Sequence, residues 1–239
     1  MTNNEFSDSF DTLVSSYRRF KDFDKREMLD SIEFDEYEKS VWLTKSQEEL
    51  VISLYNGKNP FGDSFESTEE LRRYLSPLVR ETKPMLSPIT NSDDIPLGIG
   101  SNSTFFTLPD DLWFITYEDV TTSDGPCGKD SKLDVYPVTQ DEYLKVRKNP
   151  FRGANGRRAL RLDLADGVIE IVCKYPVVRY YIRYIRKPNP IVLEDLPNGL
   201  TIENKRKESE CELHEALHQK ILERAVRMAL QSKGLKIDE

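Results

Sequence analysis

The sequence predicts an α+β protein in which a helical N-terminal region and a long C-terminal amphipathic helix flank a β-rich, sandwich-like body. Apolar residues recur at helical spacing near both ends of the chain and alternate with polar residues between them. The 239 residues are enough to bury about 70% of the surface that the unfolded chain exposes. The 11 tyrosines and 11 phenylalanines argue against disorder, although charged residues make up 32% of the chain.

Residues 1–83 are predicted to be helical. One helical face near the N-terminus collects Phe10, Leu13, Val14 and Tyr17. The clearest helix covers residues 44–56, because Thr44 and Gln47 have the spacing of a capping box and Gly57 is placed to end the helix.

A second helix and a linker complete the first half of the prediction. Ser67 and Glu70 form another capping box, and Pro77 is expected to stop or kink this helix near Ser76. Residues 84–104 lack periodicity and are rich in proline, serine, asparagine and glycine. A loop of this length is uncommon inside a compact domain, so we expect a linker or a functional arm.

Residues 105–205 are predicted to form the β-rich body. Strands are expected at 112–117 and 133–138, with a short helix at 140–148. Leucines alternate with polar residues before Asp166-Gly167 and isoleucines do so after it, which predicts a β-hairpin. The longest predicted strand buries Val178, Tyr180, Ile182 and Tyr184 on one face.

The opposite face of that strand carries Arg179, Tyr181 and Arg183. Interleaved arginine and aromatic side chains can bind single-stranded nucleic acid by stacking and charge. The same residue types are enriched at protein interfaces. The net charge of −8 favours a protein interface, because nucleic-acid-binding domains are usually basic.

Charge is unevenly distributed along the chain. Residues 1–49 hold 13 acidic and 7 basic side chains, whereas residues 150–190 hold 9 basic and 3 acidic ones. The two blocks can complement each other within one molecule or between neighbouring copies. They can equally be two solvated faces of a monomer.

Residues 206–239 are predicted to contain the C-terminal helix, whose periodic part is 209–233. Its apolar stripe supplies three further candidate interface residues, Leu213, Leu217 and Ile221. We expect this helix to pack against the body of the protein or against a neighbour.

The stretch His214 to His218 matches the H-E-x-x-H pattern, in which two histidines on one helical face bind zinc and the glutamate is a general base. No third ligand follows at the spacing of the zinc protease families. Cys211 would complete a Cys-x2-His-x3-His set, which is not a protease arrangement. We therefore expect partly buried packing histidines, no catalytic or metal-binding residue and no cofactor. Whether the two histidines bind any metal is left open.

Four stretches together resemble a known family: residues 36–58, 141–153, 179–196 and 211–229. They are similar, in sequence and in order, to head-to-tail ring (adaptor) proteins of crAss-like tailed bacteriophages. The resemblance covers most of the chain and rests on patterns of fold and packing.

This resemblance implies a virion structural protein without enzyme activity, namely a ring subunit in the portal–tail connector through which phage DNA passes. Its implied partners are further copies in a twelve-fold homo-oligomeric ring, the portal protein, neighbouring ring or tail proteins and, transiently, DNA, but no membrane. The protein would be made in the host bacterial cytoplasm and reside at the head-to-tail junction of the virion. The alternatives are another head-completion, tail-completion or cargo-gate virion protein, a zinc-dependent hydrolase, and a DNA-binding module.

Overall fold

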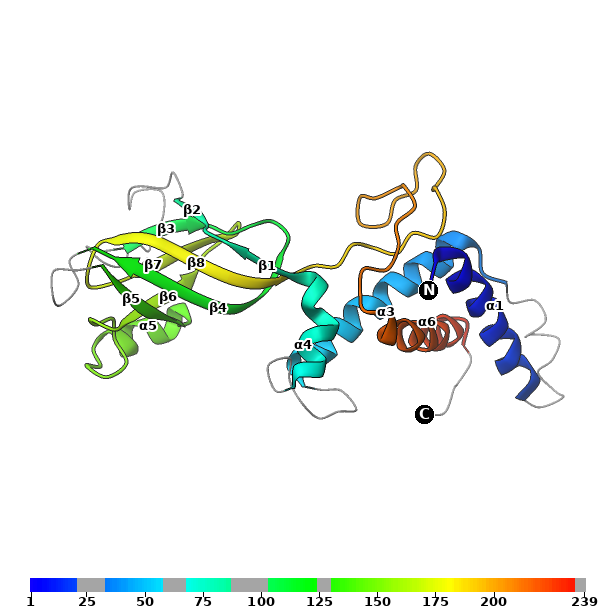
Figure 1. The fold of residues 1–239 in the computed structure, drawn as a ribbon, viewed down its shortest axis with the longest axis horizontal. Coiled ribbons are helices and arrows are strands. Elements are labelled where there is room, and N and C mark those ends of the chain that lie inside the picture. Colours follow the sequence, from blue (N-terminus) through cyan, green and yellow to red (C-terminus); the bar gives the residue numbers. More distant parts are fainter. Residues whose placement is uncertain (21–32, 58–67, 87–102, 124–129, 235–239) are drawn as a thin grey trace. The chain divides into compact units, whose positions relative to one another are not determined.

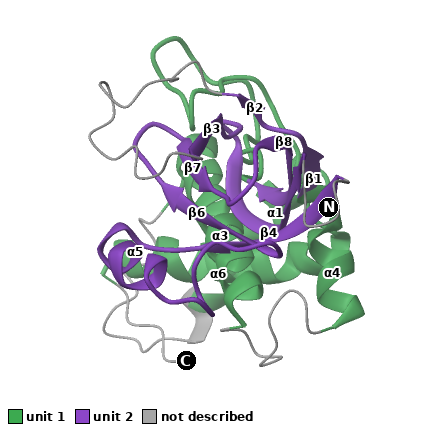
Figure 2. Ribbon diagram, turned by 90° about the vertical axis from the view of Figure 1, so that its left-hand side faces the viewer, with its two compact units in different colours: residues 1–78, 187–239 green, residues 79–186 purple. Residues whose placement is uncertain are grey.

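The computed structural model describes residues 1–20, 33–57, 68–86, 103–123 and 130–234 (Figure 1). These residues form two compact units (Figure 2). Unit 1 combines residues 1–78 with residues 187–239, and unit 2 is formed by residues 79–186. Unit 2 is therefore an insertion between the two halves of unit 1.

The described part of unit 1 is helical at both ends of the chain. Its helices are α1 (Asn3–Phe20), α3 (Glu36–Asn56), α4 (Glu69–Leu75) and α6 (His218–Ser232). Helix α6 packs against both α3 and α1. Their apolar faces form the core of the unit, to which α1 contributes Phe6, Phe10 and Val14. No helix in the described ranges is long and apolar enough to cross a membrane.

Helix α3 begins eight residues earlier than the sequence predicts. Its N-cap is Asp35, whose carboxylate accepts from the backbone N–H of Glu38 at 2.6 Å. Gly57 ends the helix with a φ of 72°, as predicted. The predicted capping box at Thr44 and Gln47 is wrong. Both residues lie in the middle of the helix, and their buried side chains donate to backbone carbonyls elsewhere in unit 1.

The region after α3 also differs in detail from the prediction. The N-cap of α4 is Thr68, whose hydroxyl accepts from the N–H of Leu71, while Ser67 lies outside the described residues. The helix ends at Leu75, and Pro77 lies in the 3-10 turn Ser76–Leu78, as expected. The next residues form a strand rather than helix, since Val79–Thr82 pair with the strand Val177–Arg186 of unit 2.

Unit 2 is built on one eight-stranded sheet with the order β1-β8-β4-β5-β6-β7-β3-β2. The strands are β1 (Val79–Thr82), β2 (Met85–Leu86), β3 (Ser103–Thr107), β4 (Leu112–Thr122), β5 (Ser131–Pro137), β6 (Arg158–Asp163), β7 (Val168–Val172) and β8 (Val177–Arg186). Among the described strands, only β5 and β6 pair in parallel. Parallel neighbours need a crossover, and helix α5 (Gln140–Arg147) provides it.

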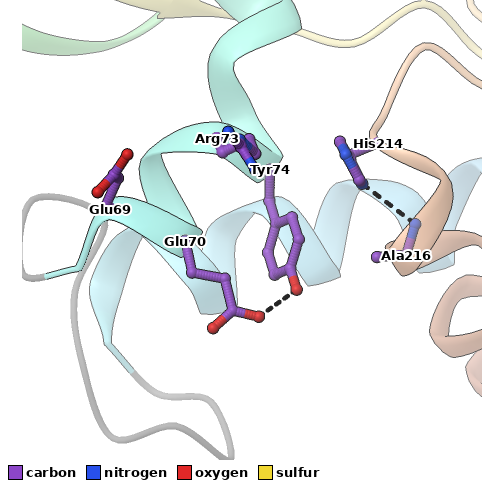
Figure 3. Close-up of a pocket in the computed structure, with 6 residues that line it drawn as sticks. All are labelled: Glu69, Glu70, Arg73, Tyr74, His214 and Ala216. Atoms are coloured by element: carbon purple, nitrogen blue, oxygen red, sulfur yellow. Dashed lines mark hydrogen bonds between the residues drawn. The ribbon is translucent and has the colours of Figure 1, made fainter.

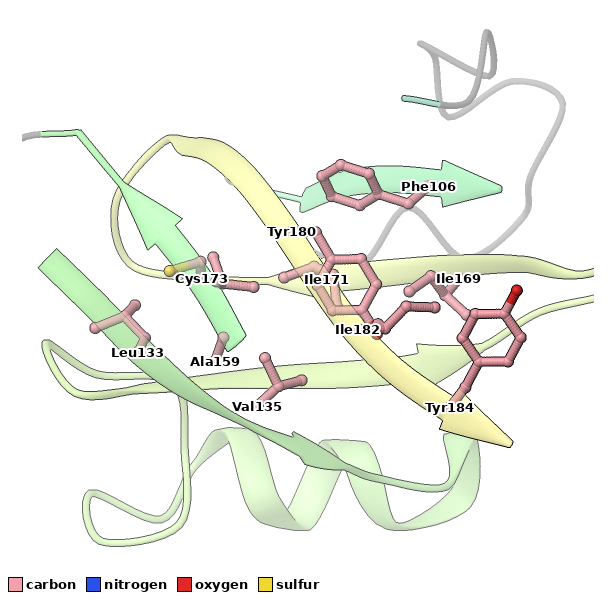
Figure 4. Packing of buried hydrophobic residues seen from close by; sticks show 11 residues of the cluster. Phe106, Leu133, Val135, Ala159, Ile169, Ile171, Cys173, Tyr180, Ile182 and Tyr184 are labelled. Atoms are coloured by element: carbon pink, nitrogen blue, oxygen red, sulfur yellow. The ribbon is translucent and has the colours of Figure 1, made fainter. Parts of the chain in front are cut away.

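The sheet curls, because its two edge strands are consecutive in the sequence. Strands β1 and β2 lie at opposite edges of the sheet, yet only Lys83 and Pro84 separate them. The sandwich-like body is therefore one curled sheet around a core (Figure 4). That core consists of Phe106, Val120, Leu133, Val135, Ala159, Ile169, Ile171, Cys173, Tyr180, Ile182 and Tyr184.

A second, smaller core lies on the other side of the sheet. Tyr143 of α5 packs there against Leu160, Leu162 and Val172, so α5 covers strands β6 and β7. The hairpin between these strands has the predicted turn, with φ values of 57° at Asp166 and 70° at Gly167. The arm expected at 84–104 starts as β2 and ends in β3, and its residues 87–102 lie outside the described part of the chain.

The C-terminal helix is shorter than predicted. Residues 187–205, which the sequence groups with the β-rich body, cluster with unit 1. Helix α6 starts only at His218 and follows the 3-10 turn Glu215–Leu217. The side chain of His214 caps that turn, since its Nδ1 accepts from the N–H of Ala216 at 3.2 Å. The histidine pattern therefore does not lie on one continuous α-helix.

Candidate functional site

The side chains of the long strand β8 alternate between the two sides of the sheet, as predicted. Tyr180, Ile182 and Tyr184 lie in the core. Arg183 is exposed on the other side, where Arg179 and Tyr181 are half-buried. Val178 is the exception, because it is 61% exposed rather than buried. It lies at the start of β8, where a register shift opposite Thr121 and Thr122 interrupts the pairing with β4.

Neighbouring strands extend this arginine–tyrosine surface. Tyr117 of β4 pairs with Arg183, and its ring lies edge-on to that of Tyr181, with 6.2 Å between centroids. Tyr136 of β5 is also exposed, and the guanidinium carbon of Arg158 lies 4.1 Å from its ring centroid. We refer to this surface as the outer face; it comprises Tyr117, Tyr136, Arg158, Arg179, Tyr181 and Arg183.

The sequence pattern alone does not predict the outer-face residues on β4, β5 and β6. Alternation along one strand shows which residues share a side, but it does not show which strands are neighbours. The strand order places Tyr117 on β4 beside β8, Tyr136 on β5 next to β4, and Arg158 on β6 next to β5. Sequence signals for these three residues are weak, since single exposed aromatics are common on protein surfaces.

Two arginines of the outer face contact polar side chains of neighbouring strands. Arg183 Nε lies 3.8 Å from Glu81 Oε1, and Arg179 Nη2 donates to Thr121 Oγ1 at 3.2 Å. Burial and the nearby Asp119 carboxylate raise the pKa of Tyr117, and burial and Glu81 raise that of Tyr181. Both phenols therefore stay protonated at neutral pH.

One carboxylate beneath the outer face is incompletely satisfied. The side chain of Asp119 is only 5% exposed, and its Oδ2 lies 3.7 Å from Lys132 Nζ. Its Oδ1 has no hydrogen-bond partner among the described residues. A buried acceptor without a donor costs free energy.

The three candidate residues of the C-terminal region lie elsewhere. Leu213, Leu217 and Ile221 are buried inside unit 1. Their stripe therefore packs against the chain's own helices rather than lying on a surface. An amphipathic stripe has the same pattern whether it faces its own core or a partner, so the sequence could not separate the two.

The histidine pattern forms ordinary packing contacts. His218 is buried, and its Nε2 donates to the carbonyl of Leu213 at 3.0 Å while its Nδ1 accepts from the amino group of Met1 at 2.7 Å. Burial raises the pKa of Cys211 to about 11, and its thiol donates to Gln47 Oε1. Across the described ranges, no group of three or more His, Cys, Asp or Glu side chains could hold a metal ion.

A second surface feature is an open pocket of about 550 Å³ in unit 1 (Figure 3). We refer to it as the α4 pocket; it is lined by Glu69, Glu70, Arg73, Tyr74, His214 and Ala216. The rings of Tyr74 and His214 lie 5.4 Å apart between centroids, and the hydroxyl of Tyr74 donates to Glu70. The pocket thus combines aromatic walls with two carboxylates.

Comparison with known proteins identifies the family. The model of the phage tail ring protein 3/4 family matches residues 1–239. The chain belongs to this family. Ring protein 3 of Bacteroides phage crAss001 is 45% identical over 236 residues, which cover 98% of this ring protein and 96% of the relative. Ring protein 4/5 of the same phage is 27% identical, over 96% of this chain and 92% of the relative.

The resemblance noted in the sequence is thus confirmed, and the chain is a structural ring protein of a phage virion. Its relatives are named as ring proteins, and neither name refers to an enzyme activity. The outer face and the α4 pocket are accordingly considered as surfaces for contact between proteins.

Proposed function

We propose that the protein forms one ring of the portal–tail connector through which phage DNA leaves the head. The match of the ring-protein family to the whole chain carries this proposal. By analogy with the family, we propose a twelve-fold homo-oligomer whose neighbours are the portal protein and other ring or tail proteins. DNA passes through its channel without stable binding.

The charge distribution supports a ring. Unit 1 holds 19 basic and 27 acidic residues, and unit 2 holds 15 of each, so unit 1 carries the whole net charge of −8. A cyclic ring needs two different faces on each subunit, which meet in a head-to-tail manner. Net negative charge also disfavours adhesion of DNA, because binding depends on basic residues that displace counterions from the phosphates.

We propose further that the outer face, with Arg179, Tyr181 and Arg183 at its centre, contacts a neighbouring subunit. Aromatic and arginine anchors dominate the energetics of protein interfaces.

The acidic block of residues 1–49 includes the stretch Asp22–Glu38, a candidate partner for this face. Residues 21–32 of that stretch lie outside the described part of the chain. Within the rest, Asp35 caps α3, Glu36 pairs with Lys39 and Glu38 pairs with Lys233. We therefore leave the acidic partner open to other carboxylates of unit 1.

Replacement of Arg179, Tyr181 and Arg183 together by serine tests the outer face. We expect assembly to weaken by about tenfold or more, because an aromatic and two arginine anchors are lost. Either arginine alone should matter little, since exposed ion pairs contribute about 0–1 kcal/mol. Assembly is measured by sedimentation at low and high salt, with circular dichroism as a control for folding. A triple variant that assembles like the wild type would show that the outer face is only solvated surface.

A further inference from the structure

Unit 2 carries a second unusual surface, the loop of residues 149–157. Its Phe151 side chain is 84% exposed. The loop is nevertheless well fixed, because Asn149 Oδ1 accepts from the N–H of Phe151 and the Asn149 carbonyl accepts from the N–H of Gly153. Arg158 Nη1 also donates to the carbonyl of Phe151 at 2.8 Å.

Gly153 explains why the loop keeps this shape. The residue is buried, and a Cβ at this position would lie 2.9 Å from the carbonyl oxygen of Asn149. Only glycine fits without moving backbone. An apolar ring that a rigid loop holds in water is favourable for binding, because a partner need not order the loop.

The surroundings of Phe151 indicate the chemistry of that partner. Residues 143–162 contain seven lysines and arginines and no acidic residue. Lys148, Arg152 and Arg157, which lie within six residues of Phe151 in the chain, are exposed. A large apolar side chain flanked by arginine is the typical composition of an interface anchor. Its complement is an acidic surface with a hollow lined by aromatic rings.

The α4 pocket of unit 1 has these properties. Its lining combines the adjacent rings of Tyr74 and His214 with the carboxylates of Glu69 and Glu70, which outnumber its one basic side chain, Arg73. Its volume of about 550 Å³ lies in the range of pockets that bury a ligand of several rings. The pocket also belongs to the unit that carries the whole net negative charge.

We propose that Phe151 of one subunit inserts into the α4 pocket of a neighbouring copy and that Arg152 pairs with Glu69 there. A protrusion and a pocket on different parts of one chain make a heterologous contact, which is the kind that closes a ring. This contact rests on the proposed ring function and adds a second attachment point to it. The outer face lies on other residues, so the two contacts can be tested separately.

Substitutions in the loop test the contact first. Phe151→Ala should weaken self-association at least about tenfold, whereas Met85→Ala should leave it unchanged, although Met85 of the same unit is 79% exposed. Arg152→Glu should weaken association as well, and adding Glu69→Lys to that variant should restore it. Sedimentation measures association, and thermal unfolding confirms that each variant is folded.

Disulfide trapping then tests which copy provides the pocket. A Phe151→Cys variant is mixed with an Ala216→Cys variant and oxidised, with the wild type as background for the native cysteines. We expect a cross-link between the two variants, mapped by mass spectrometry, and none when Met85→Cys replaces Phe151→Cys.

The outcomes separate this contact from the ring itself. A wild type that stays monomeric at all concentrations contradicts both proposals. If the wild type assembles but the Phe151 and Arg152 variants associate equally well, only the contact in the α4 pocket is wrong. The same holds if no cross-link forms between the Phe151→Cys and Ala216→Cys variants. It also holds if Arg152→Glu abolishes binding of duplex DNA while self-association is unchanged, because the loop then serves DNA.

Discussion

His218 shows how a single side chain gains a structural role from its surroundings. Its ring is buried against Phe6, with 5.4 Å between centroids, and both ring nitrogens have partners. Burial, together with the positive amino group of Met1, lowers the pKa of His218 below its usual value, and the hydrogen bond to Leu213 opposes this shift. The folded protein therefore contains the neutral imidazole at neutral pH.

A pH dependence of stability follows from this lowered pKa. Below the unfolded-state pKa of about 6.5 the unfolded chain binds a proton that folded His218 resists, so stability falls as the pH decreases. We expect Tm to drop between pH 7.5 and pH 5 by more in the wild type than in His218→Gln, which keeps a donor for the Leu213 carbonyl. His214→Gln serves as the control and should follow the wild type. Equal slopes in all three proteins would contradict this role of His218.

At the scale of elements, helix α3 shows how buried hydroxyl side chains attach a helix to a distant segment of the chain. Thr44 Oγ1 accepts from the N–H of Ile191 at 3.1 Å and donates to the carbonyl of the same residue at 3.2 Å. Nearby, the hydroxyl of Ser40 accepts from the N–H of Leu193. Helix α3 thus binds the extended chain that returns from unit 2 through buried hydroxyls.

Thr44→Val tests this attachment. The substitution keeps the shape of the side chain but leaves the buried N–H of Ile191 without its acceptor, so we expect a loss of about 1–3 kcal/mol in the free energy of unfolding. Thr12→Val is the matched control, because the Thr12 hydroxyl binds only its own exposed helix, and its effect should stay within about 0.5 kcal/mol. Denaturant unfolding measures both. A Thr44→Val protein as stable as the Thr12→Val protein would refute the attachment.

The same residues show how far the sequence allowed prediction. Periodicity located the strand 177–186, the hairpin at Asp166-Gly167 and the ends of two helices, because these features depend on neighbours in the chain. The sequence predicts Thr44 as a helix cap, because the sequence pattern is the same whether the threonine hydroxyl binds backbone of its own helix or of a distant segment. The partner, Ile191, is 147 residues away, and pairings over such distances are set by tertiary packing.

The candidate surfaces show the same difference between features set by neighbours in the chain and features set by tertiary packing. Arg179, Tyr181 and Arg183 could be placed together from alternation along β8, whereas Tyr117 and Tyr136 required the strand order. Phe151 and the α4 pocket required exposure and loop geometry, which no single-sequence pattern provides.

At the scale of the whole molecule, the chain consists of an acidic unit 1 and a unit 2 without net charge, inserted between the two halves of unit 1. Unit 2 carries the basic surfaces, namely the outer face and the loop of Phe151. Unit 1 carries the α4 pocket and the surplus of carboxylates. Two unlike faces on one subunit favour heterologous, ring-forming contacts over a symmetric dimer.

The mass of the assembled protein tests the central claim most directly. Native mass spectrometry of the purified chain, alone and with the portal protein that we propose as its neighbour, should give one closed species in which this chain contributes a single integer multiple of 27.7 kDa. The outer-face triple variant and Phe151→Ala should shift this species toward monomers. A symmetric dimer, or a monomer both with and without the portal protein, would contradict the account of a ring subunit.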